Sequence, residues 1–127
     1  MLVDHVDLRV GDVAKVRALY DALAGAMGYT DVHVESGSVG YHRSNETGED
    51  AFFWIVCEAG HAPNGTRIAF GATSRAEVDR LTEIARANGA RDIDGPLLMT
   101  EYGSNYYASF FDDAEGNKLE ICCRRVE

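Results

Sequence analysis

LVDHVDLRV at residues 2–10 alternates apolar and polar side chains as a half-buried strand does, and a second strand-like stretch, TRIAFGA, occupies residues 66–72. A helical pattern follows each stretch. The N-cap candidates of these helices, Asp12 and Ser74, lie 62 positions apart in a chain of 127 residues. A repeat of about half the chain predicts two small units with the same order of elements.

Both halves predict the order strand, helix and three strands. In the first half, apolar residues recur at helical spacing from Val13 to Met27, and Gly28 suits a left-handed helix end. In the second half, Ser74-Arg75-Ala76-Glu77 is a capping box and Gly89 ends the helix, which is expected at 74–88. The remaining strands are expected at residues 30–35, 38–43 and 51–57, and again at 91–94, 106–111 and 118–123.

Composition limits the class of protein and its partners. The length and the 46% hydrophobic content predict a single domain, residues 1–127, with one module at about 1–60 and another at about 64–127. The net charge of −9 repels phosphate backbones and anionic surfaces, so neither nucleic acid nor membrane is expected as a partner. The first residues lack the pattern of a signal peptide, which predicts a cytoplasmic protein. The cysteines lie in apolar runs and are expected to be reduced and buried: Cys57, Cys122 and Cys123.

Two connecting segments of the second half, residues 95–105 and 113–117, have distinctive compositions. Residues 95–105 read as a loop that is rich in turn formers but apolar at 97–99. A flap over a pocket and an ordinary surface connection both agree with this pattern. The turn at 113–117 is expected to take positive φ angles at Gly116 and Asn117 and to expose its acidic side chains.

The last segment, YYASFFDDAEGNKLEI at residues 106–121, carries the most specific pattern. Together with the strand beginning Asp-His-Val and the paired layout, it resembles the vicinal oxygen chelate superfamily, also called the glyoxalase, bleomycin-resistance and extradiol-dioxygenase superfamily. The closing hairpin of that family reads aromatic-x-x-Asp-Pro-x-Gly-Asn, and Ala114 stands where its proline is usual. The resemblance covers essentially the whole chain.

This resemblance implies an α+β fold of two pseudo-symmetric βαβββ modules. The modules would form a cupped mixed or antiparallel sheet with the helices on its outer face. A homodimer and a small organic ligand are expected as well. The modules could pair within one chain or across the dimer.

The resemblance also implies metal ligands on the first and last strands of each module, which here carry His5, Trp54, Arg67 and Glu120. His5 and Glu120 suit a divalent metal such as Zn, Fe, Mn or Ni, whereas Trp54 and Arg67 offer no lone pair for one. Two ligands hold a metal weakly. We therefore expect either no cofactor or a weakly bound divalent metal at His5 and Glu120, and we favour none.

Arg67 suggests what replaces the ion. If Arg67 and Glu120 point into the same cup, a guanidinium–carboxylate contact would neutralise the glutamate. The alternative is that Arg67 leans toward solvent and Glu120 is a satisfied carboxylate on a half-exposed strand. With the resemblance, the candidate catalytic residues are His5 and Glu120 as acid–base groups and Arg67 as a fixed cation.

Four aromatic residues are candidates for substrate binding. Phe52 and Trp54 share one face of their strand, and alternation sends Tyr106 and Tyr107 to opposite faces. They could wall an organic ligand or simply pack in the core. The other histidines are expected to be exposed polar residues, although His42 has the best chance of reaching the cup: His33, His42 and His61.

Two functions therefore remain open. The first is a small-molecule lyase, isomerase or dioxygenase whose metal site is degraded by Arg67. The second is a metal-free protein of the bleomycin-resistance type that sequesters an aromatic or cationic molecule.

Overall fold

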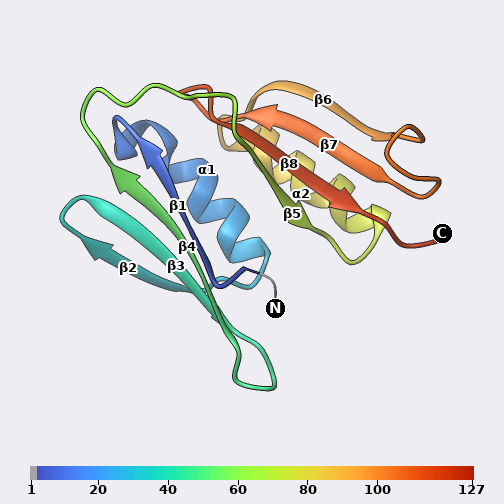
Figure 1. The fold of residues 1–127 in the computed structure, drawn as a ribbon, viewed down its shortest axis with the longest axis horizontal. Coiled ribbons are helices and arrows are strands. Elements are labelled where there is room, and N and C mark those ends of the chain that lie inside the picture. The colour runs from blue at the N-terminus through green and yellow to red at the C-terminus, as the bar shows by residue number, and fades with distance from the viewer. Residues whose placement is uncertain (1–2) are drawn as a thin grey trace. The chain divides into compact units, whose positions relative to one another are not determined.

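One helix and one mixed sheet of four strands make up each half of the chain in the computed structural model, which describes residues 3–127 (Figure 1). This confirms the predicted α+β class and the βαβββ order. The chain divides into two units, Met1–Ala62 and Pro63–Glu127. The first contains β1 (His5–Val10), α1 (Val13–Ala26), β2 (Asp31–Glu35), β3 (Ser38–Ser44) and β4 (Asp50–Cys57). The second contains β5 (Arg67–Gly71), α2 (Arg75–Ala87), β6 (Arg91–Leu98), β7 (Tyr107–Asp112) and β8 (Lys118–Cys123).

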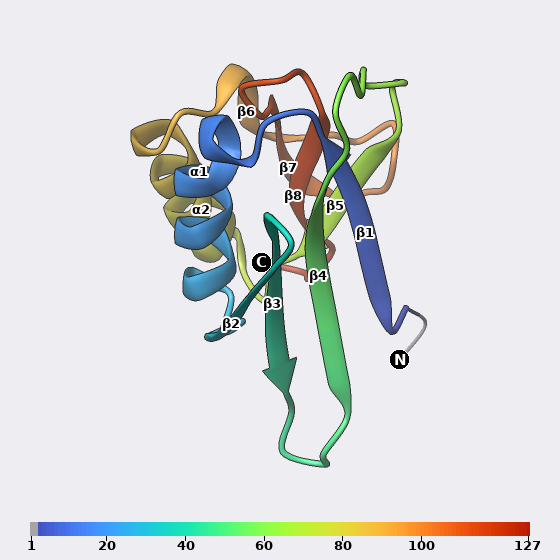
Figure 2. The same ribbon diagram turned by 90° about the vertical axis from the view of Figure 1, so that its left-hand side faces the viewer.

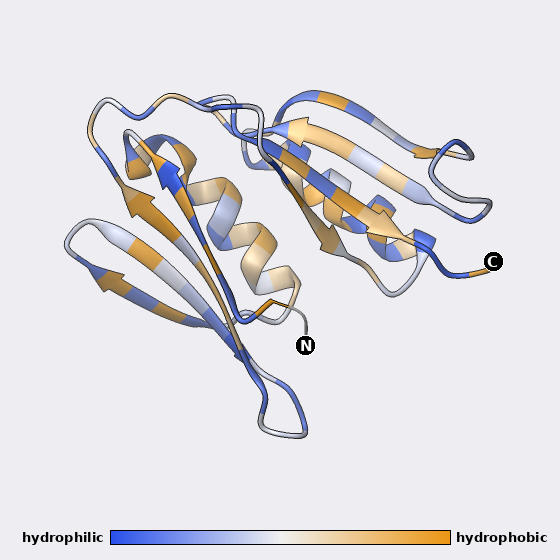
Figure 3. Ribbon diagram, viewed as in Figure 1, coloured by the Kyte–Doolittle hydropathy of each residue, from blue (hydrophilic) through white to orange (hydrophobic). Residues whose placement is uncertain are grey.

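The sheet of the first unit has the strand order β1-β4-β3-β2, with β1 parallel to β4 and the other neighbours antiparallel. Helix α1 lies on one side of this sheet and contacts β3 and β4 (Figure 2). Strand alternation buries one face under the helix, and β4 is mostly apolar in colour while the connection before it is hydrophilic (Figure 3). The buried hydrophobic residues of this layer are Val10, Val16, Leu19, Tyr20, Leu23, Ala24, Val39, Tyr41, Phe53 and Ile55.

The sheet of the second unit repeats this arrangement in the order β5-β8-β7-β6, with β5 parallel to β8. Helix α2 contacts β6, β7 and β8. The side chains between helix and sheet are fully buried, and they include Val78, Leu81, Ala85, Phe111, Leu119 and Ile121. The other face of this sheet carries the polar and aromatic residues of the candidate site. Among the described residues, no helix is both long and apolar enough to cross a membrane.

The predicted helix ends agree closely with the structure. Asp12 caps α1, and Ser74 caps α2 by accepting a hydrogen bond from the backbone N–H of Glu77 at 3.1 Å. The Glu77 carboxylate accepts from the backbone N–H of Thr73 at 2.6 Å, one residue before the position that a capping box predicts. Gly89 has a φ of +99°, as the left-handed end of α2 requires.

The predicted loop at 95–105 is wrong at its beginning. β6 continues from Arg91 to Leu98, so the first four residues of the expected loop belong to a strand. The pairing of β6 with β7 is irregular on both sides of Asp94, which explains why turn-forming residues occur inside a strand. The connection that remains lies between Leu98 and Tyr107.

The acidic side chains of the turn after β7 were expected to be exposed, and this prediction is wrong for Asp113. Asp113 is fully buried, and its carboxylate accepts hydrogen bonds from the backbone N–H groups of Glu115 and Asn117 and from the Asn117 side-chain amide. Within this described turn, Gly116 alone has a positive φ, so Asn117 contributes its amide rather than a left-handed backbone. Asp113 thus supplies the acceptors that hold the turn together.

The cysteines are free, but they are not all buried. Cys123 is buried, Cys122 is half-buried, and Cys57 at the end of β4 is exposed. The prediction of burial was therefore wrong for Cys57, because the strand ends before the helix layer can cover its last residue.

Candidate active site

A concavity of about 650 Å³ lies in the second unit, over the sheet face that α2 does not cover. Strand residues form its floor, and the segments that flank β7 and β8 form its wall. The lining includes Arg67, Phe110, Lys118 and Glu120 from the strands, and Met99, Tyr102, Tyr106 and Arg124 from the flanking segments. The inward parity expected for Arg67 and Glu120 is therefore observed within this unit.

Glu120 is the central acidic group of the concavity. It lies in the middle of β8, is 6% exposed, and accepts a hydrogen bond from the hydroxyl of Tyr106. Burial first, and then the neighbouring Cys122 and Glu120, raise the pKa of Tyr106 well above its ordinary value of 10, so its hydroxyl remains a proton donor at neutral pH. No other described group donates a hydrogen bond to the Glu120 carboxylate. The carboxylate therefore keeps acceptor sites for a ligand.

The contact considered between the Arg67 guanidinium and the Glu120 carboxylate is not formed. The guanidinium lies over the ring of Phe110, 4.9 Å from the ring centroid, and no described carboxylate lies within ion-pair distance of it. Phe110 is the register partner of Glu120 on the neighbouring strand. The aromatic face thus holds the cation beside the glutamate without neutralising it.

Arg124 is a site residue that the sequence reasoning missed. It follows β8, and its guanidinium lies 4.5 Å from the ring centroid of Tyr106, the residue that binds Glu120. Tyr102 packs edge-on against the same tyrosine ring at 5.6 Å. Alternation along the chain offers a signal for Arg124, because positions 120, 122 and 124 share one parity.

One charge pair in the concavity is already satisfied. Lys118 and Asp112 are register partners on β8 and β7, and the ammonium lies 2.9 and 3.1 Å from the two carboxylate oxygens. The other charged residues of the lining are Arg67, Asp92, Asp94, Glu120 and Arg124.

The tyrosine pair divides between the two faces as alternation predicts. Tyr106 faces the concavity, whereas the hydroxyl of Tyr107 donates to Asp79 on α2 at 2.6 Å. Tyr107, which we had named as a substrate-binding candidate, therefore lies on the helix side of the sheet.

Trp54 occupies the corresponding sheet face of the first unit. Its indole lies against the backbone of Gly40 on β3, where an added Cβ would come within 2.6 Å of the ring. A shallow concavity of about 320 Å³ surrounds it and is also lined by Asp7 and Glu35. This face thus presents an aromatic ring beside two carboxylates.

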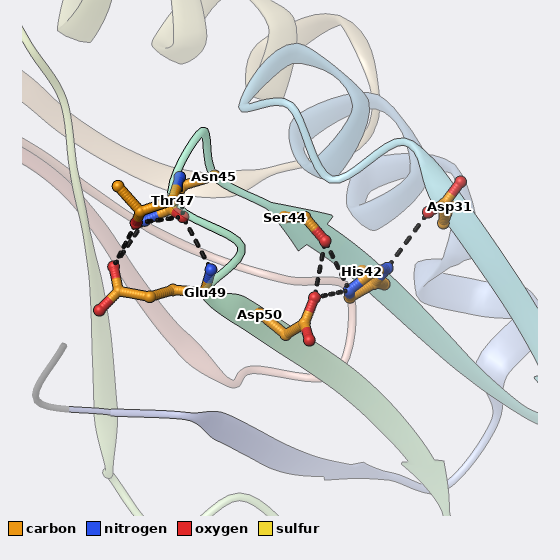
Figure 4. A network of polar contacts seen from close by, with 7 residues as sticks. All are labelled: Asp31, His42, Ser44, Asn45, Thr47, Glu49 and Asp50. Carbon is orange, nitrogen blue, oxygen red and sulfur yellow. Dashed lines mark hydrogen bonds and ion pairs between the residues drawn. The ribbon is translucent and has the colours of Figure 1, made fainter.

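The ring of Phe52 is covered by His42, with the two ring centroids 4.5 Å apart. His42 is held between two acids: its Nδ1 lies 3.1 Å from Asp31, and its Nε2 lies 2.7 Å from Asp50 (Figure 4). Hydrogen bonds to Asp50 first and then to Asp31 raise the pKa of His42 above 6.5. Its side chain is 18% exposed, so the expectation of a solvent-exposed histidine was wrong.

His5 belongs to the first unit. Its side chain is 56% exposed, and its Nδ1 lies 2.8 Å from the carboxylate of Asp4. This hydrogen bond raises the pKa of His5 above 6.5. The catalytic role of His5 stays a prediction.

Comparison with known proteins identifies the family of this chain. The sequence matches the Glyoxalase/Bleomycin resistance protein/Dioxygenase superfamily over residues 2–121. The chain belongs to this superfamily. It is 24% identical over 127 residues to the uncharacterized protein YqjT of Bacillus subtilis (strain 168), covering 92% of this chain and 94% of that protein.

Solved structures share the superfamily fold. A glyoxalase/bleomycin resistance protein from Albidiferax ferrireducens T118 matches with a TM-score of 0.78 at 24% identity, over 98% of this chain and all of that chain. The fosfomycin resistance protein FosX from Listeria monocytogenes, crystallised with Mn(II) and a sulfate ion, matches with a TM-score of 0.69 at 17% identity. That match covers 98% of this chain and 91% of FosX.

The second unit of this superfamily member does not fit a divalent metal. Glu120 is a suitable donor, but Arg67 and Arg124 in the same lining are guanidinium groups that offer no lone pair, and Asp92, Asp94 and Asp112 do not gather with Glu120 into a group that could hold an ion. Among residues 3–127, no three side chains of His, Cys, Asp or Glu gather to hold an ion. The pairing of His5 with Glu120 as metal ligands stays a prediction.

Proposed function

We propose that this superfamily member is a lyase or isomerase that moves a proton on a small organic substrate with adjacent oxygen atoms. Glu120 acts as the acid–base group, and Arg67 acts as the fixed cation. The observation that carries the proposal is the Glu120 carboxylate, which is 6% exposed, faces the concavity and receives one hydrogen bond, from Tyr106.

The chemistry follows from these two groups. Glu120 accepts a proton from the carbon next to a substrate carbonyl, and the C–H electrons move to the carbonyl oxygen, which becomes negative. Arg67 donates N–H hydrogen bonds to that oxygen. In an isomerase, Glu120 then returns the proton to a different carbon. In a lyase, the electrons return from the oxygen, a carbon–carbon double bond forms as the bond to a leaving group on the next carbon breaks, and Glu120 gives its proton to the departing group.

Tyr106 is a positioning residue in this scheme. Its hydroxyl fixes one oxygen of the Glu120 carboxylate, so the other oxygen faces the substrate. The guanidinium of Arg67 is available to a substrate oxygen because its protein contact is the face of Phe110 rather than a carboxylate.

Proton exchange in deuterium oxide tests the proposal. A panel of small hydroxyketones, keto acids and amino acids is incubated with the native chain and with Glu120→Gln, and loss of each C–H signal is followed by proton NMR. We expect exchange with the native chain and a decrease of about 100-fold or more in Glu120→Gln. Glu83→Gln on α2 is the matched control. Equal rates in native chain and Glu120→Gln, or no exchange with any compound, contradict the proposal.

A second candidate function is the binding of an aromatic cation on the first unit. It is favoured by the Trp54 indole, which lies on Gly40 with Asp7 and Glu35 in the lining of the same concavity. Aromatic faces and carboxylates together attract organic cations.

Fluorescence of Trp54, the one tryptophan of the chain, tests this candidate. Benzyltrimethylammonium is expected to change the emission at lower concentrations than the neutral benzyl alcohol, and Asp7→Asn is expected to weaken the response. Equal responses to the two compounds exclude a cation site.

A further inference from the structure

The charged groups of the second unit's concavity do not all neutralise one another. Lys118 pairs with Asp112, and Glu120 is bound by Tyr106. The remaining charged groups of the lining have no ion pair or hydrogen bond with any described residue, and they are two of each sign: Arg67, Arg124, Asp92 and Asp94.

Two of these opposite charges, Arg67 and Asp94, are both neighbours of Phe110. The guanidinium of Arg67 lies over Phe110, 4.9 Å from its centroid. Asp94 on β6 and Glu120 on β8 are the register partners of Phe110 on its two sides. Directly paired residues of antiparallel strands point to the same face, so these side chains share the floor of the concavity. At the usual strand spacing, the Cα atoms of Asp94 and Glu120 lie roughly 10 Å apart.

The arrangement disfavours a ligand that carries charge of only one sign. An anion bound by Arg67 would face the unpaired carboxylate of Asp94, and a cation bound by Asp94 would face the unpaired guanidinium of Arg67. A molecule that carries both charges satisfies both groups. Phe110, Met99 and Tyr102 supply apolar surface for the rest of such a molecule.

We infer that the ligand of this concavity is a small zwitterion of the amino-acid type, whose carboxylate binds Arg67 and whose ammonium group binds Asp94 above the Phe110 ring. The inference rests on the proposed function, because it names the substrate class of the same site. The volume of about 650 Å³ accommodates an amino acid with a large side chain.

Three probes of similar shape distinguish the contribution of the ligand's carboxylate from that of its ammonium group. L-phenylalanine carries both groups, N-acetyl-L-phenylalanine carries the carboxylate alone, and L-phenylalaninamide carries the ammonium alone. Their affinities for the native chain are measured at low ionic strength by calorimetry and by amide chemical shifts in NMR. We expect L-phenylalanine to bind about fivefold more tightly than either blocked form, with shifts at Arg67, Asp94 and Phe110.

Variants assign each charge to its partner. Asp94→Asn is expected to remove the preference for L-phenylalanine over the N-acetyl form, and Arg67→Gln to remove its preference over the amide. Arg86→Gln and Glu83→Gln are the matched controls, because these residues form an exposed pair on α2. The controls are expected to keep both preferences.

Several results overturn the inference. Equal binding of the three probes does so, as does failure of all three to bind at millimolar concentrations. Preferences that survive in Asp94→Asn and Arg67→Gln also contradict it. These outcomes are separate from the fate of the proposed function, since proton exchange that depends on Glu120 can occur with a substrate of another class.

Discussion

Tyr106 and Glu120 form a buried donor–acceptor pair in the second unit, with side chains that are 7% and 6% exposed. The pair joins the segment before β7 to the middle of β8. The Arg124 guanidinium lies over the Tyr106 ring, and the Arg67 guanidinium lies over Phe110, the register partner of Glu120. The buried carboxylate thus shares its concavity with two guanidinium groups.

Replacing Tyr106 by Phe should destabilise the second unit. The change removes the hydroxyl that binds a buried carboxylate, which typically costs about 1–3 kcal/mol. Urea unfolding at pH 7 measures the loss. Tyr107→Phe is the matched control, because its hydroxyl binds the exposed Asp79, and it should cost less than about 1 kcal/mol. A loss below about 1 kcal/mol in Tyr106→Phe would show that the Glu120 contact contributes little.

Gly40→Ala should disturb the first unit through its tryptophan. A Cβ at Gly40 would come within 2.6 Å of the Trp54 ring, so the indole must move from β3. We expect a loss of about 1–3 kcal/mol together with a shift in tryptophan emission. Gly71→Ala is the control, since a Cβ on this β5 residue meets nothing within 4 Å. Unchanged emission in Gly40→Ala would contradict the close packing of indole and backbone.

The His42 cluster predicts two pH limits for the stability of the first unit. The raised pKa of His42 means that its contribution is complete below pH 6.5 and is lost as the pH rises through the raised value. Hydrogen bonds from Ser44 and then His42 lower the pKa of Asp50 below 3.8. The contribution of Asp50 is therefore complete above pH 3.8 and is lost as the pH falls through the lowered value.

Urea unfolding followed by Trp54 emission across pH 3–9 measures both limits. We expect the alkaline loss to disappear in His42→Gln and to persist in His33→Gln, because His33 on the exposed β2 has no acid bound to its ring in the described structure. If stability is still lost at rising pH in His42→Gln, the loss must come from groups other than His42.

The cysteines should react with a thiol reagent in the order of their exposure. Cys57 is exposed and should react first, whereas Cys123 is buried and should react on unfolding. Burial raises the pKa of the half-buried Cys122, which lowers its thiolate fraction and should place it between them. Mass spectrometry of the native chain after timed labelling measures the order. Labelling of Cys123 before Cys57 would contradict the described burial.

Periodicity was sufficient to predict most of the fold. The two helices, their caps and the βαβββ order along the chain follow from alternation, from helical spacing and from Asp12 and Ser74 at the helix starts. The sequence failed at β6, because Gly95 and Pro96 indicate a turn locally while pairing with β7 continues the strand. Such tertiary pairing is not visible in a single segment.

The site was predicted in part. Parity placed Arg67 and Glu120 on one sheet face, and it sent Tyr106 and Tyr107 to opposite faces without showing which of them joins the concavity. It could not show that Arg67 stacks on Phe110 instead of pairing with Glu120, because that choice depends on side-chain geometry across three strands. Arg124 was missed for a similar reason, since its stacking on Tyr106 lies beyond the end of β8.

The metal content of the purified chain, measured by mass spectrometry after incubation with Mn, Fe, Zn or Ni and dialysis, tests the central claim most directly. The claim is that a concavity in which Glu120 is accompanied by the guanidinium groups of Arg67 and Arg124, rather than by a second lone-pair ligand, does not hold a divalent metal. We predict less than stoichiometric metal in the native chain and a gain of metal in Arg67→His, which restores a lone-pair donor. Stoichiometric metal in the native chain that is lost in Glu120→Ala would contradict the account.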